Sequence, residues 1–359
     1  LLPRIYRFYG SQNERTRDGL VSSLQWKTPT LNLSLDTMYS KLENTREETL
    51  FGILVRSTKT SNRALPAGAT NNNGLIPVNV KIDPSSNLLT GTFANTTYNG
   101  GAAYTKDETE FGYGALNASW KVSDKLTLTS QASLNQSTAT SATGQLAGYI
   151  YGAQSTIDYG DDHVYPSISS PTSYTDPNNW SGFTIGTGWT KETDKGKQAR
   201  VVADWDYDLP GEWTGHLKAG VTFVSTTKGV NKRNGTALAT AKLNSIGAAG
   251  LRNGMTSELP IENLDFGAGW PNAWSTWNSS YFYSQFDPNT YNPASTFTPS
   301  QSFTAQEDVK TAFVQSDFKG KIGERELRLN AGVRYSGTDT KIDNFKQQGA
   351  SLVYSPNHE

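Results

Sequence analysis

Apolar and polar residues alternate along four pairs of segments, and a short turn joins the two segments of each pair. In the first pair, Leu20, Leu24 and Trp26 share one face of a period-two pattern, whereas Ser23 and Gln25 fall on the other. A period of two places successive side chains on opposite faces of a β-strand. Each pair therefore predicts a β-hairpin. The four predicted hairpins lie within residues 20–39, 116–135, 199–223 and 312–335.

The third pair has the most regular alternation. Its first segment places Val201 and Trp205 on one face and Asp204, Asp206 and Asp208 on the other. Three carboxylates on one face would be costly in a dry core, so this face is expected to meet water. The sequence thus predicts strands with one apolar face and one wet face.

Most of these alternating runs are about nine to eleven residues long, which is the length that a tilted strand needs to cross a bilayer. Aromatic residues lie near the ends of the runs, where amphipathic rings favour the boundary between acyl chains and headgroups. They are Trp26, Tyr39, Trp120, Tyr207, Trp213 and Tyr335. The pattern predicts an all-β, antiparallel transmembrane β-barrel.

The connections are strongly unequal in length. Turns within the pairs are short, whereas the connectors between pairs run to roughly 70, 60 and 80 residues, far beyond ordinary loops. This asymmetry is typical of outer-membrane barrels, with short periplasmic turns and long extracellular loops. The connectors are long enough to contain further strands.

Composition narrows the function classes. The chain has 35% hydrophobic, 11% aromatic and 18% charged residues, with a net charge of -1. The chain has no stripe of basic residues, so the sequence does not predict a nucleic-acid partner. Cysteine is absent, which excludes thiolate metal sites and cysteine nucleophiles. The three histidines, at 163, 216 and 358, are far apart, and no nucleophile-elbow motif occurs, so we expect neither an enzyme nor a cofactor.

Acidic residues gather in the second long connector, at Asp158, Asp161 and Asp162, next to His163. Oxygen ligands at this density could hold a calcium ion, but the spacing lacks the pattern of an EF-hand loop. We therefore expect a solvated acidic loop and no metal site.

The third long connector carries a cluster of aromatic residues, and we take five of them as candidate substrate-binding residues. Amides and carboxylates occur among them. Exposed rings beside such groups could grip a sugar ring or an aromatic chelator. Alternatively, the rings pack the connector against itself or against the barrel rim. The five candidates are Trp270, Trp274, Trp277, Tyr281 and Tyr283.

Several stretches resemble TonB-dependent outer-membrane receptors, especially the large group found in oligotrophic proteobacteria. The first runs from Pro3 to Tyr9 and continues through 14–20 and 24–27, with an Arg-rich run, a Gly-Leu and a Gln-Trp before a turn. The segment 35–43 is similar to the next strand of these receptors. Residues 312–318 and 327–335, which include Leu-Arg-Leu-Asn-Ala-Gly-Val-Arg-Tyr, match most closely.

The resemblance implies an active importer whose barrel of about 22 strands is closed by a plug. Members of this family carry ferric siderophores, cobalamin or oligosaccharides. The implied partners are outer-membrane lipid, a small solute and an inner-membrane energy-coupling complex, TonB, reached through the plug. The chain has no plug-like segment and ends in Asn357-His358-Glu359, so we expect residues 1–359 to be part of a larger barrel domain. A passive porin or a secreted β-rich carbohydrate-binding protein remains the alternative.

Overall fold

The computed structural model describes residues 5–54, 76–159, 166–258, 271–348 and 351–358. Eleven strands form one antiparallel sheet, which confirms the predicted all-β antiparallel class. The sheet is open over the described residues and is not closed into a barrel. Its main order is β1-β2-β4-β5-β7-β8-β9-β10-β11, and β3 and β6 pair with β4 and β5.

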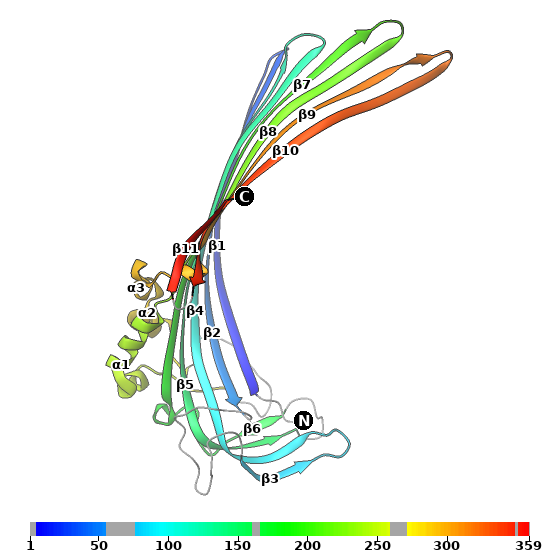
Figure 1. Ribbon diagram of the computed structural model, residues 1–359. Helices are drawn as coiled ribbons and strands as arrows, with labels where there is room; N and C mark the ends of the chain where they lie inside the picture. The colour runs from blue at the N-terminus through cyan, green and yellow to red at the C-terminus, as the bar shows by residue number, and fades with distance from the viewer. Residues whose placement is uncertain (1–4, 55–75, 160–165, 259–270, 349–350, 359) are drawn as a thin grey trace.

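The strands differ greatly in length. They are β1 (Ile5–Lys27), β2 (Leu31–Leu54), β3 (Ile76–Ile82), β4 (Leu89–Lys121), β5 (Leu126–Asp158), β6 (Ser167–Ser169), β7 (Ser181–Leu209), β8 (Trp213–Arg233), β9 (Phe303–Ile322), β10 (Arg325–Gln348) and β11 (Ser351–His358). All four predicted hairpins form, as β1–β2, β4–β5, β7–β8 and β9–β10. Their tips fan out at one end of the sheet (Figure 1).

The predicted strand length was too short. Strands β4 and β5 have 33 residues each, because pairing continues beyond the point where apolar alternation stops. On β2, for example, Lys41 and Glu43 follow Tyr39 on the same face, and the pairing with β4 is uninterrupted. Backbone hydrogen bonds do not require apolar side chains, so an alternation test ends before the strand does. The connectors are correspondingly shorter than predicted.

The two faces of the sheet differ most near the hairpin turns. One face, called the apolar face below, carries exposed large apolar side chains on every long strand. The register aligns them in rows that cross eight strands. One such row is Trp26, Leu33, Ala118, Ser130, Val201, Val221, Ala312 and Tyr335. We call these rows the apolar band, and the opposite face the polar face.

A second layer covers the apolar face at the end remote from the turns. It includes α1 (Thr236–Asn253), α2 (Ser279–Phe286) and α3 (Pro288–Tyr291), which lie beside one side of the sheet in Figure 1. These helices pack on Tyr104, Leu146 and Ile185, whose register places them on the same face as the apolar band. The sequence analysis did not predict helices here. Among the helices of the described residues, none is long and apolar enough to cross a membrane.

The core of this end of the molecule is mainly aromatic. Phe51 and Tyr98 from the sheet pack against Tyr174 and Trp274 from the connectors, with ring centroids 4.8–5.6 Å apart. The buried Trp180 indole donates a 2.9 Å hydrogen bond to the carbonyl of Tyr174. Apolar burial and satisfied polar atoms together hold the connectors on the sheet.

Candidate functional site

The richest group of charged side chains lies on the polar face, beside the hairpin turns of β7–β10. The register arranges these residues in rows that cross the four strands. The row nearest the middle is Asp204, Lys218, Gln315 and Gly332, the next is Asp206, His216, Asp317 and Asn330, and the row nearest the turns is Asp208, Thr214, Lys319 and Arg328. Charged residues of both signs thus face the same side.

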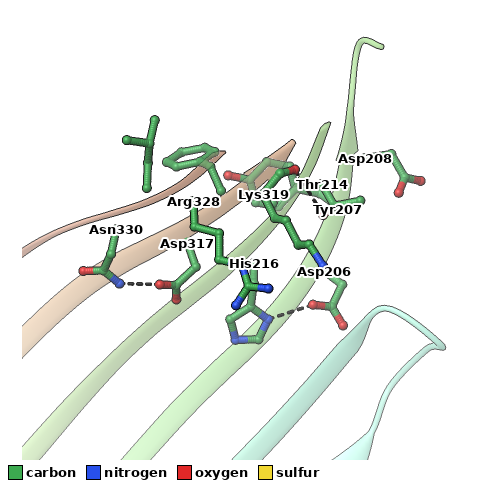
Figure 2. A pocket seen from close by; sticks show the side chains of 12 residues that line it. Asp206, Tyr207, Asp208, Thr214, His216, Asp317, Lys319, Arg328 and Asn330 are labelled. Carbon is green, nitrogen blue, oxygen red and sulfur yellow. Dashed lines mark hydrogen bonds and ion pairs between the residues drawn. The ribbon is translucent and has the colours of Figure 1, made fainter. Parts of the chain in front are cut away.

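Two carboxylates of β7 hold His216 of β8. The His216 Nδ1 atom lies 2.7 Å from the Asp206 carboxylate, and Nε2 lies 3.4 Å from Asp204. Asp204 also lies 3.2 Å from the Lys218 ammonium. Figure 2 shows the side chains of Lys319 and Arg328 directed toward this group. The imidazole and the Lys218 ammonium therefore link β8 to the carboxylates of β7.

A second group of contacts links β9 to β10. The Asn330 amide donates to Asp317, as the dashed line in Figure 2 marks. Glu326 accepts from Arg328 at 2.9 Å and lies 3.2 Å from Lys319. A hollow of about 590 Å³ lies here, lined by Asp206, His216, Asp317, Lys319, Arg328 and Asn330 from these groups and also by Tyr207, Phe318 and Leu329.

The charged side chains at this hollow are open to water. The side chains of Asp206 and Asp208 are 68% and 73% exposed, so their ion pairs contribute little to stability. The side chains instead present donors and acceptors in a regular array. Over the described part of the chain, no group of three or more acidic or histidine side chains could hold a metal ion. Asp161, Asp162 and His163 lie outside the described residues.

The sequence contains the signal for the contacts between β7 and β8, because a short turn fixes which residues of a hairpin lie opposite one another. The turn at Pro210, Gly211 and Glu212 sets Leu209 opposite Trp213. Uninterrupted antiparallel pairing from that point places Asp206 opposite His216. The pairing across β8 and β9, by contrast, bridges a connector of 69 residues and could not be read from any turn.

Two of the predicted substrate-binding residues are fully buried. Trp274 packs on Phe51, and Trp277 packs on Phe183 with ring centroids 5.6 Å apart. The Trp277 indole donates a 3.0 Å hydrogen bond to the carbonyl of Leu251. Of the two alternatives for these tryptophans, the structure supports packing of the connector. Trp270 lies outside the described residues.

The remaining two candidates are partly exposed. Tyr281 lies in the first turn of α2 with its ring against Gly254, and its hydroxyl lies 3.5 Å from the carbonyl of Gly250. Tyr283 packs at 5.8 Å from Tyr104, and burial raises the pKa of both phenols, with a further contribution from the nearby Glu47 carboxylate. These two tyrosines stay candidates for contact with a solute at the surface of the connector.

No protein-family model matches the chain, and no curated protein matches its sequence. The arguments for function therefore rest on the chain and its geometry.

Proposed function

We propose that this chain is part of a TonB-dependent transporter in the outer membrane of a Gram-negative bacterium. In this proposal the barrel imports a scarce solute, such as a ferric siderophore or an oligosaccharide. Residues 1–359 form part of its barrel domain and carry out no catalysis.

The observation that carries the proposal is the apolar band. Leu24, Leu116, Val201, Val221 and Val333 are between 48% and 67% exposed, yet the register aligns them over the width of the sheet. So large an apolar surface is unfavourable in water and suits contact with hydrocarbon. The same stretch of the polar face carries the charged rows, which suits an aqueous interior.

The edges of the sheet support a larger closed barrel. Over the described residues, β1 has a partner on one side only, and so does β10 from Arg325 to Thr340. Unpaired backbone groups in hydrocarbon each cost several kcal/mol, so membrane sheets close on themselves. Further strands are needed to complete the barrel, and about 22 is the number that the family resemblance implies.

The unequal connections support a receptor in preference to a small passive porin. Four tight hairpins lie at one end, and the layer with α1–α3 lies at the other. In the proposed orientation the hairpins face the periplasm and the layer faces outward. Solute would meet Tyr281, Tyr283 and the other exposed groups of this layer first, and the charged rows of the polar face would line its route. A plug would connect the barrel to the TonB complex.

Fractionation of Gram-negative cells that produce the protein tests the location. We expect the full chain in the outer-membrane fraction, released only by detergent. A protein that stays in solution without detergent would instead support the secreted carbohydrate-binding alternative.

Uptake measurements test the mechanism. Cells are supplied with labelled ferric siderophores and oligosaccharides, with and without a protonophore. Active transport requires energy from the inner membrane, so uptake of the substrate should fall when the protonophore is present. Uptake that is insensitive to the protonophore would support a passive porin.

A further inference from the structure

A shallow apolar hollow interrupts the band on β7–β10. Its volume is about 460 Å³, and its walls include Val201, Val221, Phe223 and Tyr335. Ala312 lies in the same row as Val201, Val221 and Tyr335, and its small side chain leaves the space open. The hollow therefore offers an apolar slot on the surface that would face lipid.

Lysines lie directly beyond this hollow on the same face. Along β7, Lys195 and Lys197 share the apolar face with Ala199 and are exposed. The carboxylates of the same stretch, Glu192 and Asp194, point to the polar face, where each lies 3.9 Å from the Lys228 ammonium. On β7, strand alternation thus places these lysines and these carboxylates on opposite faces. Lys197 shares its row with Asp308 of β9, whose carboxylate interacts with it electrostatically.

A third lysine reaches the end of the hollow itself. Lys310 of β9 lies in the row of Phe223 and lines the hollow. Its ammonium lies 3.7 Å from Asp339, and both side chains are largely exposed, so this pair is weak. Asp308 lies in the next row, where Ser225 and Gln306 hydrogen-bond to it. Lys195, Lys197 and Lys310 thus share this face with two carboxylates, Asp308 and Asp339, which leaves a small excess of positive charge.

Tyr335 marks the boundary between the apolar slot and the lysines. Gly337 pairs with Lys310 and has no side chain, and the Tyr335 hydroxyl lies over it. The Tyr335 ring thus covers the row of Ala312, while its hydroxyl reaches the row of Lys310. An amphipathic ring in this position is typical of the boundary between acyl chains and headgroups.

We propose that this part of the apolar face is a binding site for an anionic phospholipid. The acyl chain fills the hollow between Val221 and Tyr335, and the phosphate lies among Lys195, Lys197 and Lys310. Strands β7 and β9 are two strand spacings, about 10 Å, apart, so flexible lysine side chains from both can reach one headgroup. The inference rests on the proposed membrane location and adds a lipid preference at a defined place.

The test uses the full chain, purified in detergent and stripped of lipid. Phosphatidylglycerol is offered in competition with phosphatidylcholine of the same acyl chains, and retained lipid is counted by native mass spectrometry. We expect preferential retention of phosphatidylglycerol. The variant Lys195→Gln/Lys197→Gln/Lys310→Gln should lower that preference by about tenfold. The control Lys228→Gln/Lys232→Gln/Lys346→Gln removes three lysines of the polar face and should leave it unchanged.

A second variant tests the apolar slot. Ala312→Trp fills the hollow and should reduce retention of phosphatidylglycerol, whereas Ala331→Trp, in another row of the band, should not. Equal retention by the two triple variants, or displacement of the lipid by inorganic phosphate, would overturn the lipid site. The membrane proposal is tested at an earlier step, during purification. A protein that stays in solution without detergent would contradict the membrane proposal before any lipid is added.

Discussion

The phenyl ring of Phe282 lies directly against the backbone of Gly144. Phe282 is fully buried on α2, and a side-chain carbon at position 144 of β5 would collide with its ring. The absence of a side chain at this position allows the connector layer to approach the sheet closely.

Gly144→Ala should therefore weaken the attachment of this layer. Overpacking of a filled core costs about 1–3 kcal/mol, which would appear as a lower free energy of unfolding and faster protease cleavage of residues 236–302. Gly112→Ala on β4 is the matched control, because no atom lies within 4 Å of the added carbon. Equal effects of the two substitutions would contradict this account of the packing.

Tyr104 holds the same layer by a hydrogen bond. Its buried hydroxyl donates to the carbonyl of Trp277 at 2.7 Å. Tyr104→Phe leaves that carbonyl buried without this donor and should lower stability by about 1–3 kcal/mol in denaturant unfolding. Tyr113→Phe, on the polar face of the same strand, should change stability by less than about 0.5 kcal/mol. If Tyr104→Phe leaves the free energy of unfolding unchanged, the carbonyl of Trp277 finds another donor.

Alkaline pH should also detach the layer. Burial raises the pKa of Tyr104 above the usual value of about 10, and repulsion from Glu47 acts in the same direction. The folded state then holds the phenolic proton more tightly than the unfolded state does. Its contribution to stability is complete below pH of about 10 and is lost as pH rises through the folded pKa. Tyrosinate absorbance and unfolding should rise together, and Tyr104→Phe should weaken this pH dependence. Ionisation of every tyrosine with the layer still attached would contradict the prediction.

Substitutions of two adjacent residues on β8 test which face of the sheet meets hydrocarbon. Val221 is 57% exposed in the apolar band, and Thr222 points to the polar face. Val221→Arg should destabilise the membrane-inserted protein by about 2–4 kcal/mol, because an arginine would face hydrocarbon. Thr222→Arg should be tolerated. Urea titration of the protein in lipid vesicles measures the difference, and equal tolerance would place both faces in water.

The sequence predicted those features that depend on neighbouring residues. Alternation identified the strands and assigned Val201 and Asp204 to opposite faces, and short turns identified the hairpin partners. Within a hairpin the turn determines the register, so even the contact between Asp206 and His216 could be inferred from local pattern.

The tertiary structure decided the remainder, for two physical reasons. Polar segments such as residues 106–110 of β4 interrupt the apolar alternation, so the extension of β4 and β5 to 33 residues depends on backbone pairing with neighbours. The burial of Trp274 and Trp277 depends on partners far away in the chain, such as Phe51. An aromatic residue in a connector has the same identity whether it meets solute or sheet, and only the folded connector determines which surface it contacts.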